Sequence, residues 1–302
     1  MRSIKKLVYA EINRRYLPGC SNYNTLEVRK RCRSKKQGRE VFAQHNVPHA
    51  RGGVFISPLA AHRFAKQHGF PLCVKPNVSG FSRGSYFPIN NYRDLWRSFF
   101  KTKVWWPATV VEEYLLGSNY RVLATPDRIV SVIRRYPPFV DGNGKDDIDT
   151  LIDRENDTRE HMQLYPVIHP IEKNSATLSY LKKQNLTLSS VPADGERVYT
   201  FNRVALAPGG VIETIDRQTL PKANEELFKS IVSMFGARLL GIDVIFEHGI
   251  EQPFTDQKCI CLEVNTRPYI SMHEVPRYGK KDNLDAFFAE MDALVVDDPD
   301  IF

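Results

Sequence analysis

The feature that most constrains the fold lies near the carboxyl end, where two apolar segments are separated by a short polar loop. Residues 239–247 (LLGIDVIFE) and 258–265 (KCICLEVN) have the length and apolar content of strands. The loop between them contains Pro253 near its centre, and proline is typical of a hairpin connection. If the strands pair symmetrically about this proline, Asp243 lies directly opposite Glu263. The pattern therefore predicts an antiparallel hairpin that opposes two carboxylates.

The polar residues of this hairpin predict a magnesium site. Glu263 and Asn265 are two residues apart and share a face, because side chains alternate along a strand. Opposed residues have Cβ atoms about 5 Å apart, a distance at which two unpaired carboxylates repel. A divalent cation between them removes the repulsion, and Mg²⁺ prefers carboxylate and amide oxygens. Asp243, Glu263 and Asn265 are therefore candidate ligands, with a half-exposed strand that shows polar residues to water as the alternative.

The cysteines do not indicate a disulfide framework. Their number is odd and they are scattered through a long chain, at positions 20, 32, 73, 259 and 261. We expect reduced thiols in a cytoplasmic protein. Cys259 and Cys261 precede the candidate metal ligands and are expected on the same strand face. They have no second Cys or His pair at zinc spacing, so no structural zinc is predicted.

The positive charge is concentrated at the amino end. Residues 1–51 contain 13 Lys and Arg against 3 Asp and Glu, whereas the whole chain of 302 residues has a net charge of +7. A basic arm can bind a polyanion. This arm lacks a nucleic-acid motif and interleaved aromatic residues, so nucleic acid is not the expected partner. No run of eighteen apolar residues occurs, so no membrane span is expected.

Two further segments contain residues suited to nucleotide binding. Lys75 ends a strand and precedes the small-residue loop NVSGFSRGS, whose glycines let backbone N–H groups turn toward phosphate oxygens. The loop matches neither a Walker motif nor G-x-G-x-x-G, so an ordinary surface turn stays open. The strand ATVVEEYLL ends with a polar-to-apolar change that suits a purine edge meeting an apolar pocket. Solvated carboxylates at a strand end are its alternative.

The remaining periodicities predict helices and strands in alternation. Helices are expected at residues 38–46, 57–67, 92–100, 147–155, 175–184 and 224–235. Strands are expected at residues 70–75, 108–114, 120–124 and 128–136. Residues 197–206 and 211–215 are predicted to form a second hairpin around Gly209 and Gly210.

Seven short phrases, in this order, resemble the ATP-grasp superfamily, and most closely the ligase modules of cyanophycin synthetase and bifunctional glutathione synthetase. The resemblance covers residues 35–279, about four-fifths of the chain. It rests on SKKQGREVFAQHNVPHARGG, FPLCVKPNVSGFSRG, VVEEYLLGSNYRVLA, IRRYPPFVDGNG, QNLTLSSVPADGERVY, LLGIDVIF and LEVNTRPYISMHEVPRYG.

The resemblance implies an α+β fold in which a small lid subdomain covers a larger, mostly antiparallel-sheet core. The implied divisions are a basic arm at residues 1–34, a helical lead-in at 35–69, the lid at 70–111 and the core at 112–302. ATP is expected between the lid and the core.

The resemblance also implies roles for individual residues. Those assigned to the nucleotide are Lys35, Lys75, Ser79, Gly80, Ser82, Gly84, Glu112, Glu113, Tyr114, Leu115, Asn119 and Arg121. Asn119 falls where relatives usually carry an acidic ribose ligand. Asp243, Glu263 and Asn265 match magnesium ligands. Arg135 and His273 match residues near the reacting carboxylate and the substrate end. Arg203 and Arg267 are further candidates for holding carboxylates by bidentate pairing.

The implied function is an ATP-dependent, ADP-forming ligase that joins a carboxylate to an amine through an acyl phosphate, using ATP and Mg²⁺ or Mn²⁺. An amino acid or short peptide is expected on at least one side. The alternatives are a ligase that modifies a protein or peptide terminus and a non-catalytic nucleotide-binding scaffold. Pro268-Tyr269 stands where relatives have Pro-Gly, so the substrate does not transfer. Relatives usually carry a domain upstream that often supplies substrate contacts. Part of the substrate site is therefore expected to be missing, or to come from the basic arm, a second subunit (a homodimer) or another protein.

Overall fold

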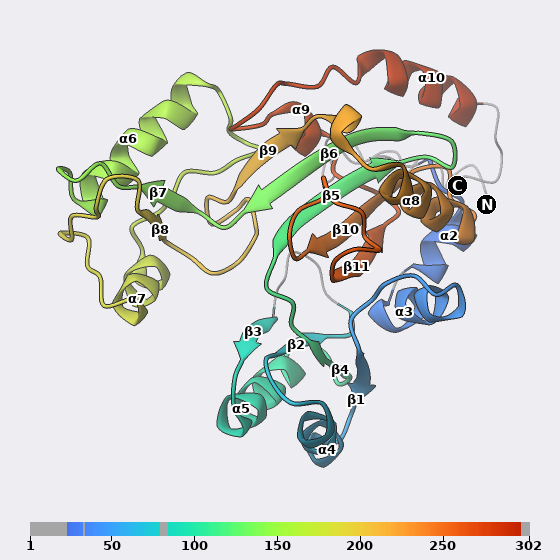
Figure 1. Ribbon diagram of the computed structural model, residues 1–302, viewed down its shortest axis with the longest axis horizontal. Helices are drawn as coiled ribbons and strands as arrows, with labels where there is room; N and C mark the ends of the chain where they lie inside the picture. Colours follow the sequence, from blue (N-terminus) through green and yellow to red (C-terminus); the bar gives the residue numbers. More distant parts are fainter. Residues whose placement is uncertain (1–22, 33, 79–83, 297–302) are drawn as a thin grey trace, which may run out of the picture. The chain divides into compact units, whose positions relative to one another are not determined.

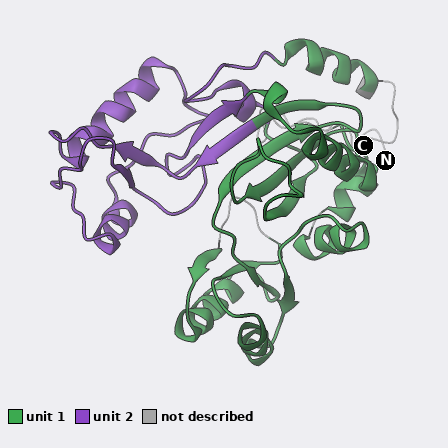
Figure 2. Ribbon diagram, viewed as in Figure 1, with its two compact units in different colours: residues 1–132, 216–269, 284–302 green, residues 133–215, 270–283 purple. Residues whose placement is uncertain are grey.

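In the computed structural model of the protein, the chain forms two compact units (Figure 2). The structure describes residues 23–32, 34–78 and 84–296. Unit 1 comprises residues 1–132, 216–269 and 284–302, and unit 2 comprises residues 133–215 and 270–283. Most of the predicted basic arm, residues 1–34, lies outside the described residues. Among the residues that are described, no helix is long and apolar enough to cross a membrane.

Unit 1 contains a four-stranded antiparallel sheet that two helices cover on one face (Figure 1). The strands follow the order β1 (Gly52–Phe55), β4 (Thr109–Glu113), β2 (Leu72–Pro76) and β3 (Tyr86–Ile89). The helices are α4 (Pro58–His68) and α5 (Tyr92–Lys103). Apolar residues of both helices, among them Ala65 and Phe99, share one core with Val74 and Val111 of the sheet. The described residues of the predicted lid, 70–78 and 84–111, lie within this layer, which also includes β1 and α4.

Local sequence signals explain where these two helices begin and end. Pro58 occupies the first turn of α4, where a missing N–H costs nothing, and Gly69 ends the helix with a φ of 77°. The side chain of Asn91 caps α5 by accepting a hydrogen bond from the backbone N–H of Asp94.

The second sheet begins in unit 1 and follows the order β11-β10-β5-β6-β9. Its strands are β11 (Cys259–Asn265), β10 (Leu240–Phe246), β5 (Ser118–Ala124), β6 (Ile129–Tyr136) and β9 (Val211–Ile215). β10 pairs antiparallel with both β11 and β5, so the predicted carboxyl-terminal hairpin is confirmed. β6 crosses from unit 1 into unit 2, to which β9 belongs.

Helices anchor this sheet within unit 1. They are α2 (Leu26–Arg31), α3 (Lys35–Gln44), α8 (Lys222–Met234) and α10 (Asp285–Val296), with the short helix η1 (Arg217–Thr219) before α8. The ring of Phe228 in α8 meets Phe246 of β10 edge-on, with centroids 6.4 Å apart. Asn24, just before α2, donates hydrogen bonds to the carbonyls of Leu239 and Thr266. This buried amide fixes the start of α2 to the chain beside β10 and β11.

Unit 2 is built around the antiparallel pair β7 (Phe139–Asp141) and β8 (Arg197–Tyr199). Helices α6 (Ile148–His161) and α7 (Ser175–Lys183) share a core with this pair, and the short helix α9 (Ser271–Glu274) also belongs to the unit. Val140 and Val198 supply the strands' part of that core. Arg197 forms a bidentate ion pair with Asp141.

The predicted hairpin between residues 197–206 and 211–215 is wrong. β8 pairs with β7, and β9 is the neighbour of β6. The backbone N–H of Thr200 continues the first pairing by donating to Pro138 O at 2.9 Å. The apolar residue Val198 is buried against α6 and α7, which draws this segment away from β9.

Candidate active site

The hairpin of β10 and β11 brings the predicted metal ligands to one face of the sheet. Asp243 is the register partner of Glu263, and Gly241 is the register partner of Asn265. Register partners in an antiparallel pair share a face. The predicted opposition of the two carboxylates is therefore confirmed, and the side chain of Asn265 follows two residues later on the same face.

A β-bulge interrupts the hairpin beside these residues. The residue after Asp243, Val244, pairs with Cys261, which leaves Leu262 as the extra residue of the bulge. Cys261 therefore shares a face with Val244, and Cys259 lies on that face too. The expectation that the cysteines share the face of the metal ligands is wrong, because counting along a strand in steps of two assumes that no bulge occurs.

An arginine from the neighbouring strand holds Asp243. Arg121 of β5 is its register partner on the other side. Arg121 Nε donates to Asp243 Oδ1 at 2.6 Å and Nη2 donates to Oδ2 at 2.8 Å. The side chains are only 10% and 7% exposed, so this is a buried bidentate pair. Asn119, two residues before Arg121, lies on the same sheet face.

A lysine holds Glu263. Lys35 Nζ lies 3.3 Å from Glu263 Oε2. Lys35 is the first residue of α3, which Ser34 and Gln37 start with a capping box. The backbone N–H of Lys35 donates to the carbonyl of Asn77, directly after β2. The start of α3 is thereby tied to the beginning of the predicted phosphate loop.

A third carboxylate, Glu112 of β4, is buried between two cations. Lys75 Nζ forms an ion pair with its Oε1, and Arg39 Nη1 donates to its Oε2 at 2.7 Å. Arg39 Nη2 also donates to the carbonyl of Ala50 at 2.8 Å. The Glu112 side chain is 5% exposed. Its carboxylate therefore fixes Lys75, a role that the resemblance did not assign to it.

Arg39 was not among the predicted site residues. It stands four residues after Lys35 on α3, a spacing that places both side chains on one helix face. That spacing was the sequence signal that could have revealed it.

The pKa values of two buried groups, Lys75 and Cys73, show which of them is charged at neutral pH. Burial disfavours the ammonium of Lys75, but the charge and hydrogen bond of Glu112, together with the nearby Cys73 and Glu263, outweigh burial and raise the pKa of Lys75 above its ordinary value. Burial raises the pKa of the Cys73 thiol, the register partner of Glu112, to about 12. Lys75 is therefore a cation at neutral pH, and Cys73 is a neutral thiol with no nucleophilic character.

The predicted adenine-binding segment follows Glu112. Glu113 accepts a hydrogen bond from the backbone N–H of Arg51 at 3.0 Å and lies 3.3 Å from Lys258 Nζ. Burial opposes ionisation of Glu113, but these contacts outweigh it and lower its pKa. Leu115 is buried in an apolar cluster with Ala50 and Ile260. A polar strand end and an apolar patch thus follow one another, as the sequence predicted.

Aromatic rings pack against this segment and against the end of the predicted phosphate loop. The rings of Tyr114 and Phe87 are stacked with centroids 5.7 Å apart. Gly84, with a φ of 70°, ends the predicted phosphate loop, and a Cβ there would come within 2.6 Å of the Trp105 ring. The predicted loop residues Ser79, Gly80 and Ser82 lie outside the described residues.

The predicted catalytic residues divide between the two units. Arg267 belongs to unit 1 and lies two residues beyond β11. Arg135, Arg203 and His273 belong to unit 2. Arg135 lies near the end of β6, the guanidinium of Arg203 lies 5.8 Å from the centroid of the Phe201 ring, and His273 is fully buried in α9.

The donor set of unit 1 fits a magnesium ion that a nucleotide shares. In the part of the chain that the structure describes, no group of three or more His, Cys, Asp and Glu side chains is arranged for a metal. Asp243, Glu263 and the amide of Asn265 offer only oxygen ligands on one face, which suits a hard cation. Mg²⁺ typically takes one or two carboxylates and completes its shell with water and phosphate oxygens.

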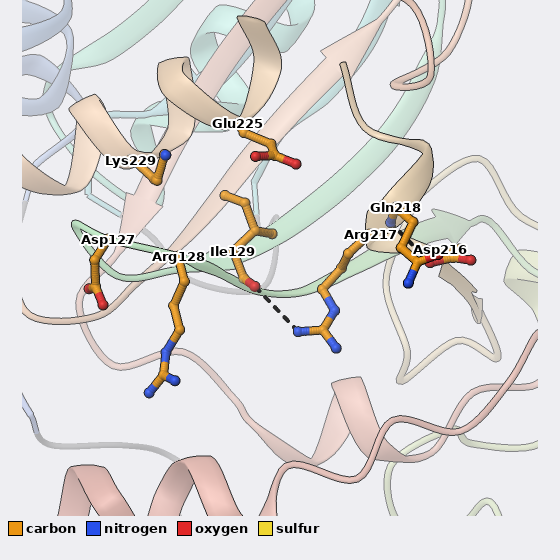
Figure 3. A pocket seen from close by; sticks show the side chains of 8 residues that line it. All are labelled: Asp127, Arg128, Ile129, Asp216, Arg217, Gln218, Glu225 and Lys229. Atoms are coloured by element: carbon orange, nitrogen blue, oxygen red, sulfur yellow. Dashed lines mark hydrogen bonds between the residues drawn. The ribbon is translucent and has the colours of Figure 1, made fainter. Parts of the chain in front are cut away.

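Unit 1 also contains a charged pocket that includes none of the predicted site residues (Figure 3). Its volume is about 420 Å³, and its lining combines three acidic and three basic side chains with Ile129 and Gln218. Arg217 Nη1 donates to the carbonyl of Ile129 across it, and Lys229 forms an ion pair with Glu226. Arg217 therefore ties η1 to β6, and Lys229 is paired within α8.

Comparisons with known proteins find relatives of two kinds. No family model matches the sequence. A cyanophycin synthetase of Geminocystis herdmanii is 28% identical over 266 residues, which cover 85% of this chain and 30% of that protein. A glutathione biosynthesis bifunctional protein of Clostridium perfringens is 26% identical over 214 residues, which cover 69% of this chain and 27% of that protein. The chain spans less than a third of the length of these two relatives.

Solved structures share the fold. A bifunctional glutathione synthetase from Pasteurella multocida gives a TM-score of 0.60 at 22% identity and covers 85% of this chain and 35% of that one. The ATP-grasp ligase PsnB, complexed with a phosphomimetic variant of a minimal precursor, Mg and ADP, gives 0.53 at 15% identity over 97% of this chain and 69% of that one. The chain has the ATP-grasp fold. The predicted α+β class and the predicted resemblance to ATP-grasp ligases are confirmed.

Within this ATP-grasp chain, the cations and carboxylates form one described cluster in unit 1. Its cations are Lys35, Arg39, Lys75 and Arg121, and its carboxylates are Glu112, Asp243 and Glu263. Four positive and three negative charges leave one net positive charge. The cluster is therefore suited to an anion that arrives with a divalent cation.

Proposed function

We propose that this ATP-grasp protein is an ATP-dependent, ADP-forming ligase that joins a carboxylate to an amine. The observation that carries the proposal is the register of β10 and β11, which opposes Asp243 and Glu263 inside a cluster of cations. A protein that only scaffolds has no use for two opposed carboxylates. The relatives named for cyanophycin and glutathione synthesis support the same class of reaction.

The chain's own residues divide the work of binding ATP. Lys35, Lys75 and Arg121 are proposed to contact the phosphates, and Glu112 to orient Lys75. The segment Glu113–Leu115 is proposed to receive adenine, with Gly84 and the loop before it against the triphosphate and Asn119 facing the ribose. Mg²⁺ or Mn²⁺ on Asp243, Glu263 and Asn265 would neutralise charge on the transferring phosphoryl group.

The proposed reaction proceeds in two displacements. A carboxylate oxygen of the substrate attacks the γ-phosphorus, and the bond from that phosphorus to the β–γ bridging oxygen breaks. The products of this first step are ADP and an acyl phosphate. The amine then attacks the acyl carbon, phosphate leaves, and the nitrogen loses a proton to give the amide. Fixed cations act by positioning and by stabilising developing charge, so neither step needs a cysteine or serine nucleophile. Arg135, Arg203, Arg267 and His273 are proposed to hold the substrates.

The proposed substrates are amino acids or short peptides. The relatives named for cyanophycin and glutathione synthesis support this class. Modification of a larger peptide is the second candidate, and the fold neighbour PsnB complexed with a minimal precursor favours testing it. The described cysteines are free thiols, which fits a cytoplasmic enzyme. A homodimer or a partner that completes the substrate site belongs to the same proposal, and light scattering tests for the homodimer.

Hydroxylamine trapping tests the reaction. The protein is incubated with ATP, Mg²⁺, hydroxylamine and pairs of candidate substrates drawn from amino acids and short peptides. Hydroxylamine should react with the acyl phosphate and yield a hydroxamate. One ADP and one phosphate should form per hydroxamate. Production of AMP and pyrophosphate would instead indicate an acyl adenylate and overturn the ADP-forming mechanism, and no nucleotide turnover with any pair would favour the scaffold.

Glu263→Gln is the sharper variant for this assay. Glu263 is 37% exposed, so the change removes a charge without opening the core. Asp243→Asn would leave the buried guanidinium of Arg121 without its carboxylate and so confounds activity with stability. Glu263→Gln should abolish hydroxamate formation, whereas Glu40→Gln, which removes an exposed carboxylate paired with Lys36, should leave it unchanged.

A further inference from the structure

Both carboxylates assigned to the metal are already paired with a cation of the chain. Glu263 is paired with Lys35 at 3.3 Å, and both oxygens of Asp243 accept hydrogen bonds from Arg121. A divalent ion that approaches this face meets two positive charges at the atoms it needs. Like charges a few ångströms apart repel even in water. These pairs therefore oppose binding of a metal ion by itself.

The two ion pairs differ in how easily they separate. Arg121 and Asp243 are 10% and 7% exposed and form two parallel hydrogen bonds. Lys35 and Glu263 are 13% and 37% exposed. The Lys35–Glu263 pair has one contact of 3.3 Å and a carboxylate more than a third exposed, so it gives up less free energy when it opens than a buried bidentate pair does. Lys35 is therefore the cation that a competing anion can draw away.

The position of Lys35 suits such an exchange. It lies at the first turn of α3, whose backbone N–H groups at Lys35 and Lys36 donate to Asn77. Asn77 immediately follows β2, so Lys35 stands at the start of the segment proposed to contact phosphate. The other lysine of the cluster, Lys75, is bound to the buried carboxylate of Glu112.

We propose that Lys35 is an internal counter-ion of Glu263, which nucleotide phosphate draws away so that the metal binds only together with the nucleotide. The proposal rests on the proposed function, because it takes the competing anion to be ATP. Transfer of the ammonium from carboxylate to phosphate conserves one ion pair and frees the Glu263 oxygens. Nucleotide and metal then bind with positive coupling, and each raises the affinity for the other.

Binding of Mn²⁺, followed by electron paramagnetic resonance, tests this proposal without turnover. The whole protein is titrated with Mn²⁺ alone and with Mn²⁺ plus a non-hydrolysable ATP analogue. Wild type should bind Mn²⁺ weakly alone and much more tightly with the analogue. Lys35→Gln should bind Mn²⁺ alone about tenfold more tightly than wild type, because a unit positive charge near the ion is gone.

Matched variants isolate the charge of Lys35. Lys36→Gln removes the neighbouring lysine, which is 62% exposed and paired with Glu40, and should leave Mn²⁺ affinity unchanged. Lys35→Arg keeps the charge and should bind Mn²⁺ as weakly as wild type. The gain of Lys35→Gln should vanish in a double variant with Glu263→Gln, since the freed ligand is then missing.

The outcomes separate this inference from the proposed function. Equal Mn²⁺ affinity for wild type and Lys35→Gln would overturn the counter-ion even if hydroxamate forms. Tight Mn²⁺ binding by wild type without nucleotide would overturn it as well. A gain in Lys35→Gln, in a protein that turns over no ATP, would support the counter-ion and contradict the ligase. The circular dichroism spectrum of each variant shows that it is folded, and Lys35→Met replaces Lys35→Gln if the latter does not fold.

Discussion

At the residue scale, one buried carboxylate organises two cations of the site. Glu112 places one oxygen on Lys75 and the other on Arg39, and Arg39 also bonds the carbonyl of Ala50. Because two cations share one carboxylate, the group of Lys75, Arg39 and Glu112 has a net charge of +1 and can attract an anion. Without Arg39, Glu112 would bind Lys75 alone and the pair would be neutral. Arg39 is therefore a positioning residue for Lys75.

Arg39→Gln should weaken binding of ATP about tenfold, since the site loses a charge and Lys75 is drawn to Glu112. The same change should lower the free energy of unfolding by roughly 3 kcal/mol, because the buried carboxylate loses a partner. Calorimetric titration with an ATP analogue measures the first effect, and urea denaturation measures the second.

Two other variants separate charge from packing at this site. Arg39→Lys keeps the charge but cannot reach both acceptors, so it should recover part of the ATP affinity. Arg51→Gln removes a 62% exposed arginine that pairs with Glu113, and it should change stability by about 0.5 kcal/mol or less. Unchanged ATP affinity in a folded Arg39→Gln protein would contradict the positioning role.

Some features of this site could be predicted from the sequence, and others could not. Arg39 stands four residues after Lys35, so helical spacing alone pairs them. The ion pair between Arg121 and Asp243 could not be predicted, because it depends on β5 being the neighbour of β10. Strand order across long separations is a property of the whole sheet and leaves no mark on either short segment.

At the scale of elements, the β10–β11 hairpin shows how far pattern reasoning reaches. The register predicted from symmetry about Pro253 is correct for the three residue pairs at the Asn265 end of the hairpin. It is wrong by one residue for the three pairs nearest the loop. The bulge at Leu262 accounts for both results, since one extra residue shifts the register by one. A bulge carries no fixed composition, so the pairing of Asp243 and Glu263 was predictable but the face of Cys261 was not.

Helix α6 depends on a carboxylate that serves two arginines within unit 2. Glu155 accepts from Arg159 Nε at 2.9 Å and from Arg277 through both of its oxygens. Arg159 in turn donates to the carbonyls of His169 and Gly209. Burial lowers the pKa of Arg159 although Glu155 opposes the shift, which shows how strongly the buried guanidinium relies on its partner.

Glu155→Gln should therefore lower the free energy of unfolding by about 3 kcal/mol, because it leaves a buried positive charge uncompensated. Asp149→Asn on the same helix is the matched control. Asp149 is 45% exposed and pairs with Lys173, so its loss should cost about 0.5 kcal/mol or less. Urea denaturation of both variants measures the difference, and equal losses would show that the Glu155 network contributes no more than a surface pair.

At the scale of the whole molecule, the chain passes between the two units four times, after residues 132, 215, 269 and 283. The first passage lies within β6, a single strand that belongs to both. Unit 2 therefore cannot unfold without disturbing the strand that continues into unit 1. Such a chain is expected to unfold as one cooperative body, although it forms two compact units.

Ligand binding tests this cooperativity, because the described nucleotide cluster lies in unit 1 alone. An ATP analogue with Mg²⁺ at about a hundred times its dissociation constant should add roughly 2.7 kcal/mol to the free energy of unfolding. The tryptophans at 96, 105 and 106 all belong to unit 1, whereas far-ultraviolet circular dichroism reports both units. Fluorescence and dichroism should therefore show one coincident unfolding transition, and both signals should shift together when ligand is added.

Glu263→Gln is the control: the two signals should still coincide, but most of the ligand-dependent shift should be lost. A dichroism transition that stays in place while the fluorescence transition moves would mean that unit 2 unfolds independently of the strand it shares.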